Sequence, residues 1–411
     1  MRKFFLVLFI SLFVVSLQAQ PAFPKGTWRA ELIREDGKTI PFIIEAKDSA
    51  GKAAWFVRNA GERLWVDNVT VKGDSVLVQM PFFDSYIRAI VTGGNKLVGE
   101  WVRRLESTES AIPFRAELNA GPRFKAAAPL SKTSISGRWE VKFVDGKKDT
   151  THSVGEFQQS GNKVTGTFLN PTGDYRFLEG VIDGDSLKMS CFDGGHAYLF
   201  TAFVRDDQSL VDGRFHSGAR YTENWFAKKN PTAALADEYA ITKLKEDSSE
   251  LNFRFKSIDG DMVGIKDVRF RNKVVLVQIM GSWCPNCMDE TSFLSEFYKK
   301  HRGRGVEVVG LAYERSTDFE RSTKNIRLFQ KRFDVKYPLL VTGVTVADTQ
   351  RTEKTLPQLQ KIHAFPTLIV IDRKGKVRKI HSGFTGPGTG IHYQNFKDEF
   401  TKLVGDLLRE K

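Results

Sequence analysis

The run VVLVQIM at residues 274–280 restricts the fold of this chain more than any other segment. Its length suits a strand better than a helix, and its apolar character predicts a strand buried on both faces. The run leads directly into WCPNC (283–287), which holds two of the chain's three cysteines. The cysteines are therefore expected at the end of a central strand.

Strand and helix patterns alternate on both sides of this run. We predict strands over 251–258, 306–314, 337–341, 367–372 and 376–383, and helices over 289–301, 317–333, 351–362 and 396–408. Residues 251–411 are therefore predicted to form an α/β domain with a mixed central sheet.

The N-terminal half has a different pattern. Residues 26–119 contain eight short segments with the two-residue period of antiparallel strands, which predicts an all-β barrel or sandwich. The motif Gly26-x-Trp28 recurs as Gly137-x-Trp139, and GDS at 73–75 recurs at 184–186 with the same offset. These matches indicate a tandem duplication of one all-β domain. We divide the chain into a signal peptide (1–20), a first β domain (21–120), a linker (121–136), a second β domain (137–230), a linker (231–250) and the α/β domain (251–411).

The first twenty residues resemble a secretory signal peptide. Arg2 and Lys3 precede the apolar residues 4–17, and residues 18–20 offer a small residue for cleavage. An apolar run of this length is shorter than the roughly 20 residues that cross a bilayer. We expect an exported, periplasmic protein that is soluble after cleavage; the alternative is an uncleaved anchor.

The formal net charge of +13 does not indicate a nucleic-acid partner. Basic residues are spread along the chain, and no recognisable nucleic-acid-binding motif accompanies them. We predict no binding to nucleic acid.

The spacing of Cys284 and Cys287 favours a redox pair. A helix that begins after Cys284 would direct its unpaired N–H groups and dipole at this sulfur and favour the thiolate. Pro285 suits the first helical position, and the spacing of three residues brings Cys287 to the same face, close enough for a disulfide. We expect Cys284 to attack and Cys287 to resolve the resulting mixed disulfide.

A metal site and a structural disulfide are the alternatives to a redox pair. A zinc site needs further ligands, and the chain has neither a second cysteine pair nor spaced histidines, so we predict no metal. A structural disulfide remains an alternative, although a bridge across so short a loop gains little entropy.

The motifs of residues 251–411 resemble those of a known family. VVLVQIMGSWCPNC is similar to the thioredoxin signature, and HAFPTLIVIDRKGKV (363–377) resembles the proline, strand and hairpin of that fold. The W-C-P-x-C form, Glu290 and the extra helix and strand before Pro366 resemble the exported thiol-disulfide oxidoreductases of the TlpA/ResA type.

This resemblance implies a role for each matching residue. Cys284 matches the exposed nucleophile and Cys287 the buried resolving cysteine of the redox-active disulfide. Pro366 matches a cis proline beside that disulfide, which would turn the Phe365 backbone toward the sulfurs and the substrate chain. The remaining matches are Trp283, which flanks the site, and Glu290, which tunes the proton affinity of the cysteines; a solvated carboxylate in the first helical turn is the alternative for Glu290.

One position departs from thioredoxin. Gln278 stands where thioredoxin has a buried aspartate, so Glu290, water or the substrate must accept the proton of Cys287. The implied activity needs no cofactor, acts on protein or peptide thiols and disulfides, and is most often reductive, with electrons from a membrane donor. The β repeats would then position clients or partners. The alternative is a lipocalin-like or partner-binding β module with a thioredoxin-like passenger.

Overall fold

The computed structural model describes residues 24–49, 52–81, 84–104, 108–127, 129, 133–235 and 241–410. The predicted signal peptide lies outside these residues. Among the helices of the described ranges, none is long and apolar enough to cross a membrane.

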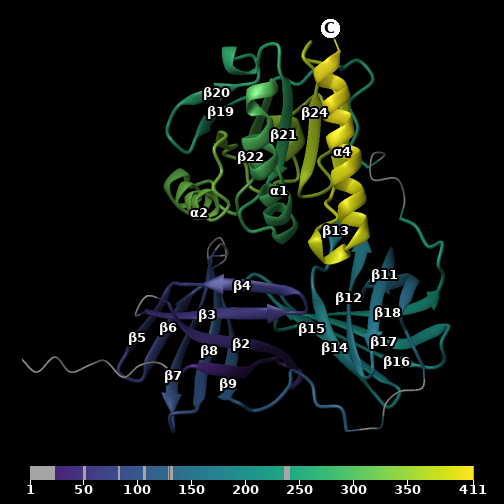
Figure 1. Cartoon of the computed structure of the whole chain (residues 1–411). Coiled ribbons are helices and arrows are strands. Elements are labelled where there is room, and N and C mark those ends of the chain that lie inside the picture. Colours follow the sequence, from purple (N-terminus) through teal and green to yellow (C-terminus); the bar gives the residue numbers. More distant parts are fainter. Residues whose placement is uncertain are drawn as a thin grey trace, which may run out of the picture.

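The chain forms two all-β units and one α/β unit, which confirms the predicted fold class (Figure 1). The two β units lie side by side, and the α/β unit packs above both of them. Helices α1 (Pro285–His301) and α4 (Ile391–Arg409) both begin at the side that faces the β units. The predicted redox motif therefore lies near the junction of the three units.

The first β unit is an antiparallel sheet in the order β4-β3-β2-β1-β9-β8-β7-β6-β5. Its strands are β1 (Gly26–Ile33), β2 (Thr39–Ser49), β3 (Lys52–Asn59), β4 (Glu62–Val66), β5 (Val69–Lys72), β6 (Ser75–Gln79), β7 (Ser85–Thr92), β8 (Lys96–Arg104) and β9 (Glu109–Leu118). One of the eight segments predicted as strands over 26–119 covers residues 64–71; the structure divides it into β4 and β5, so this prediction was wrong. Asp67 and Asn68 separate β4 from β5 there, because aspartate and asparagine are uncommon in β-strands.

The second β unit closes into a barrel because β11 pairs with both β10 and β12. Its strands are β10 (Gly137–Val144), β11 (Thr150–Ser160), β12 (Lys163–Asn170), β13 (Gly173–Asp174), β14 (Leu178–Asp183), β15 (Ser186–Phe192), β16 (Ala197–Val204), β17 (Ser209–Ser217) and β18 (Tyr221–Lys229). Packed aromatic rings fill the interior, with Phe168 and Phe200 stacked at 4.7 Å and Trp225 edge-on to Phe168 at 5.2 Å. This interior is a packed core.

The two β units repeat one structural plan. In each, the first strand pairs antiparallel with the last, β1 with β9 and β10 with β18. Trp28 is fully buried and donates its indole N–H to the carbonyl of Pro24 at 3.1 Å. Trp139 is equally buried and donates to the carbonyl of Ile135 at 2.8 Å, also four residues earlier. The repeated sequence motif thus has the same structural role twice.

The α/β unit has a mixed sheet in the order β20-β19-β23-β22-β21-β24-β25. Its strands are β19 (Arg254–Ser257), β20 (Met262–Gly264), β21 (Val274–Met280), β22 (Val306–Ala312), β23 (Leu339–Val341), β24 (Thr367–Ile371) and β25 (Val377–Ser382). Its helices are α1, α2 (Phe319–Arg332), α3 (Arg351–Thr355) and α4, with single 3₁₀ turns at Val268–Phe270, Arg302–Arg304 and Pro387–Thr389. Every residue of β21 is buried, as predicted for 274–280.

Two helix predictions need correction. The helix predicted over 351–362 stops at Thr355, because Pro357 follows and cannot continue a helix. Helix α4 begins at Ile391 rather than at residue 396, directly after Gly390 in a left-handed conformation (φ 61°). Neither change moves the predicted site residues.

Candidate active site

Cys284 is the N-cap residue of α1 and begins the redox turn. Its backbone is extended (φ −105°, ψ 118°) and follows β21, which ends at Met280, after a short turn; Pro285 is the first helical residue, as predicted. The Cys284 Sγ accepts a hydrogen bond from the backbone N–H of Cys287 at 3.3 Å. Both cysteines are free thiols in this structure. The sulfur of Cys284 thus satisfies one of the N–H groups that a helix start leaves unpaired.

A second segment reaches the same sulfur from the start of β24. The peptide bond between Phe365 and Pro366 is cis. The Cys284 thiol donates to the Phe365 carbonyl at 3.3 Å. The structure therefore brings together Cys284, Cys287, Phe365 and Pro366.

Cys284 is less accessible than the sequence predicted. Its exposed fraction is 4%, and that of Cys287 is 0%, so the expectation of an exposed nucleophile was wrong. The second β unit packs against the turn between the cysteines: the Arg176 guanidinium donates to the Pro285 carbonyl at 3.1 Å. Gly173 (φ 140°) lies so close to Asn286 that any side chain at Gly173 would overlap the asparagine amide. The second β unit thus covers the turn that begins at Cys284, an arrangement that no local pattern encodes.

Glu290 lies in the interior behind the cysteines. Its exposed fraction is 0%, which contradicts the alternative of a solvated carboxylate. Gln278 on β21 donates from Nε2 to Glu290 Oε2 at 2.9 Å and accepts at Oε1 from the Thr291 hydroxyl at 3.0 Å. Burial raises the pKa of Glu290 to about 8, although the bond from Gln278 lowers it. Gln278, at the position of thioredoxin's aspartate, thus holds the glutamate in place.

Cys287 is held as a neutral thiol. Burial raises the pKa of Cys287 well above its ordinary value, and the sulfur of Cys284 and the charge of Glu290 raise it further. The second Glu290 oxygen, Oε1, has no hydrogen-bond partner within the described part of the chain. A proton leaving Cys287 therefore has an unsatisfied acceptor atom on a neighbouring residue.

Trp283 covers the side of the site next to β22. Its indole N–H donates to the Tyr313 carbonyl at 2.8 Å, and its ring meets that of Phe365 edge-on at 5.4 Å. The Arg315 guanidinium lies over the indole, 5.4 Å from the ring centroid. Trp283 is thereby fixed between the redox turn and the cis-proline segment.

Arg176 is a functional residue that the sequence did not reveal. It is 5% exposed, in the turn between β13 and β14, and pairs with Asp289 on α1 at 2.7 Å and with Glu62 on β4. Asp193 is a third carboxylate, 3.9 Å away. Burial acts to lower the pKa of Arg176, but the three carboxylates raise it well above its ordinary value. One side chain thus joins all three units at the redox turn, and only tertiary structure brings its partners together.

The pKa of the Asp289 carboxyl group is shifted at the same junction. Burial raises the pKa of Asp289 to about 7, while Arg176 acts to lower it. Asp174 adds a further link, because its carboxylate accepts from the backbone N–H of Gly386 at 2.7 Å. The second β unit therefore contacts both the redox turn and the loop that follows β25.

The third cysteine is separate from this site. Cys191 lies in the core of the second β unit, 1% exposed, and burial raises the pKa of its thiol well above the ordinary value. It is an apolar core residue, and no disulfide joins it to Cys284 or Cys287.

Comparisons with known proteins match the α/β unit. Residues 245–391 match the model of the Redoxin family. The thiol-disulfide oxidoreductase ResA of Bacillus thuringiensis subsp. konkukian (strain 97-27) is 28% identical over 138 residues, which are 32% of this chain and 70% of that protein. The thioredoxin-like protein YneN of Bacillus subtilis (strain 168) is 24% identical over 140 residues, 34% of this chain and 73% of that protein.

Two solved structures are similar over the same part. A thiol:disulfide interchange protein of the thioredoxin family from Chlorobium tepidum TLS is 21% identical, with a TM-score of 0.31, and covers 40% of this chain and 98% of its own. A thiol-disulfide oxidoreductase from Bacteroides fragilis NCTC 9343 is 16% identical, with a TM-score of 0.28, and covers 36% of this chain and 99% of its own. The Redoxin domain is identified by the family match over residues 245–391, which lie in the α/β unit.

Proposed function

We propose that this chain is an exported thiol-disulfide oxidoreductase that reduces disulfides of protein or peptide clients. The Redoxin domain and the similarity to ResA and YneN support thiol-disulfide oxidoreductase activity. The observation that carries the proposal is the pair of free thiols at the start of α1, with Cys284 Sγ bound between the Cys287 N–H and the Phe365 carbonyl. Metal binding and a purely structural bridge do not require this arrangement.

The proposed reaction has two exchange steps. The Cys284 thiolate attacks one sulfur of the client disulfide, forms a mixed disulfide and releases the other client sulfur as a thiolate, which takes up a proton. Cys287 then loses its proton and attacks Cys284 Sγ, which forms the Cys284–Cys287 disulfide and releases the second client thiol. The client gains two electrons, the cysteine pair loses two, and a dithiol donor must reduce the pair again.

Glu290 is the proposed proton acceptor for the second step. Its pKa of about 8 is close to the operating range of a general base at neutral pH, and Oε1 is unsatisfied. The Phe365 backbone, beside the cis Pro366, is the proposed contact for the extended client chain.

The β domains are proposed to position the redox turn and the client. The contacts of Arg176 and Gly173 with Pro285 and Asn286 support a positioning role. A lipocalin-like ligand site gains no support from the second β unit, whose interior is filled by aromatic side chains. The proposal also includes the export signal and a membrane electron donor. It keeps the domain boundaries at residues 20, 120, 136, 230 and 250.

The full-length chain is expected to catalyse the reduction of a disulfide-linked peptide by dithiothreitol. The peptide thiols released over time would be followed by mass spectrometry, with the uncatalysed reaction as reference. A rate equal to that reference would contradict the proposed function.

The Glu290→Gln variant is expected to flatten the dependence of stability on pH. Below about pH 4.5, the ordinary pKa of glutamate, Glu290 is protonated in the folded and unfolded states alike. Between about 4.5 and about 8 the unfolded chain loses this proton first, so the free energy of unfolding falls as pH rises and levels off above about 8. Glutamine cannot titrate, so the variant should lose this contribution, which is on the order of a few kcal/mol.

Urea unfolding at pH 5, 6.5 and 8.5 measures this difference. The matched control is Glu296→Gln on the same helix, where the side chain is 78% exposed. Parallel pH dependences for wild type and Glu290→Gln would show that the buried carboxyl does not have a raised pKa.

A further inference from the structure

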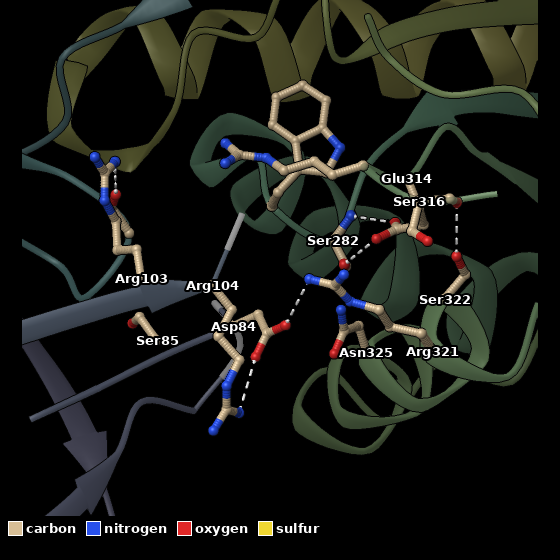
Figure 2. A pocket seen from close by; sticks show the side chains of 13 residues that line it. Asp84, Ser85, Arg103, Arg104, Ser282, Glu314, Ser316, Arg321, Ser322 and Asn325 are labelled. Atoms are coloured by element: carbon tan, nitrogen blue, oxygen red, sulfur yellow. Dashed lines mark hydrogen bonds and ion pairs between the residues drawn. The ribbon is translucent and has the colours of Figure 1, made fainter. Parts of the chain in front are cut away.

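A cavity at the seam of the three units adjoins the redox turn. It is lined by Ser85, Arg103 and Arg104 from the first β unit, Gly195 from the second, and Ser282, Trp283 and the segment 314–316 from the Redoxin domain. Figure 2 shows Arg103 on one side of this cavity and Glu314 and Arg321 on the other. Trp283, which lines the cavity, directly precedes Cys284, so the cavity adjoins the redox turn through this residue.

Two arginines of this cavity have no acidic partner. Within the described ranges, neither Arg103 nor Arg315 has a carboxylate oxygen within the 4.0 Å of an ion pair. Arg103 Nη1 donates only a long bond of 3.4 Å to the Gly195 carbonyl, and its buried Nε has no partner. The other two arginines are different: Arg104 and Arg321 both pair with Asp84, at 3.4 and 3.5 Å.

Arg103 and Arg315 line the same cavity, and both side chains are half-buried. Burial lowers the pKa of Arg103, and the charge of Arg315 lowers it further. Burial likewise lowers the pKa of Arg315, whereas Glu314 and Cys284 act to raise it. Glu314 forms no ion pair with either arginine, and its two oxygens accept hydrogen bonds from Ser282 at 2.8 and 2.7 Å. Asp193 acts on Arg103 and Glu314 on Arg315 without forming an ion pair, so an anion bound in the cavity would stabilise both cations.

We propose that Arg103 and Arg315 form a carboxylate-binding site that selects clients with an acidic group beside the cysteine to be reduced. The inference rests on the proposed function, because it names the substrate class of the same redox site. Guanidinium groups suit carboxylates through paired hydrogen bonds, and water exclusion strengthens each bond. The two arginines come from different units, so the site exists only when the first β unit is docked on the Redoxin domain. This gives the β unit a part in client selection.

The test compares disulfide-linked dimers of one capped peptide. In the first the cysteine is flanked by Glu, in the second by Gln, and in the third the Gln peptide ends in a free carboxylate next to the cysteine. Bis(2-hydroxyethyl) disulfide is the small neutral reference. Wild type should reduce a carboxylate-bearing peptide with a kcat/KM at least about 10-fold above that for the capped Gln peptide.

The variants Arg103→Gln and Arg315→Gln should each lose most of this preference, measured as the ratio of kcat/KM for the Glu peptide to kcat/KM for the Gln peptide in the same variant. Arg88→Gln, in an exposed pair with Glu100 on the first β unit, is the matched control and should keep the preference. If the preference holds only for the free terminal carboxylate, the site binds a chain end; if only for the Glu peptide, it binds acidic side chains.

A cysteine-free Glu peptide, which should inhibit wild type where its Gln analogue does not, tests the site without any substitution. Equal rates for acidic and neutral peptides, or a preference that survives both arginine changes, would overturn the inference. If wild type reduced neither bis(2-hydroxyethyl) disulfide nor any of the peptide disulfides, this result would instead refute the proposed function.

Discussion

Replacing Cys284 with serine is expected to lower the rate of peptide-disulfide reduction by the full-length chain by more than about 100-fold. A serine hydroxyl is not ionised near neutral pH and cannot form a mixed disulfide. The hydrogen bonds to Phe365 and Cys287 can persist with an oxygen in place of sulfur, so the fold should be retained. The loss would therefore report on chemistry rather than on structure.

Cys191→Ala is the control for this loss. Cys191 is buried in the core of the second β unit, outside the redox site, so its removal should leave the specific activity of the folded protein near that of wild type. Thermal unfolding of both variants would separate a loss of folded protein from a loss of activity. A Cys284→Ser variant within a few-fold of wild type would contradict the assignment of the nucleophile.

Replacing Arg176 with methionine is expected to destabilise the docked arrangement by about 3 kcal/mol or more. The substitution leaves the carboxylates of Glu62, Asp289 and Asp193 buried without their shared cation. It also removes the bond to the Pro285 carbonyl, so the redox turn loses a direct contact with the second β unit. Arg176→Lys keeps the charge but not the forked geometry and should have an intermediate effect.

The effect is measured by calorimetry, which resolves separate transitions if the units no longer unfold together. Alkylation of Cys284 by iodoacetamide gives a second readout, because loss of docking should expose the thiol that is now 4% accessible. The control is Arg220→Met. Arg220 forms an ion pair with Glu35 at the surface, and exposed ion pairs contribute little to the free energy of unfolding. If Arg176→Met matches this control in both measurements, Arg176 does not hold the units together.

Much of the redox turn could be predicted from the sequence because its determinants are local. A seven-residue apolar strand, a proline after the first cysteine and the three-residue spacing dictate a strand, a helix start and two neighbouring sulfurs. The position of Pro366 beside Cys284 needed the family resemblance, since the 81 residues between them carry no local signal of contact. The structure shows this contact through the adjacent Phe365 carbonyl.

The surroundings of that turn could not be predicted because they depend on docking between units. Arg176 and Gly173 belong to the second β unit, and nothing in their sequence neighbourhood indicates that they meet Pro285 and Asn286. The exposure of Cys284 was overestimated for this reason. Two alternatives stood for Glu290 because a glutamate near the start of a helix is usually solvated. The structure places it in the second turn of α1, where it is buried and accepts a hydrogen bond from Gln278.

The most direct measurement of the proposed chemistry is the intact mass of the full-length Cys287→Ala variant after it is mixed with a disulfide-linked peptide. Without the resolving thiol, the first exchange step should stop at the mixed disulfide. The predicted result is one added peptide chain, located on Cys284 by fragmentation, removed by dithiothreitol and absent when Cys284 is also changed to serine. An unmodified mass, or an adduct on Cys191, would contradict attack by Cys284 and resolution by Cys287.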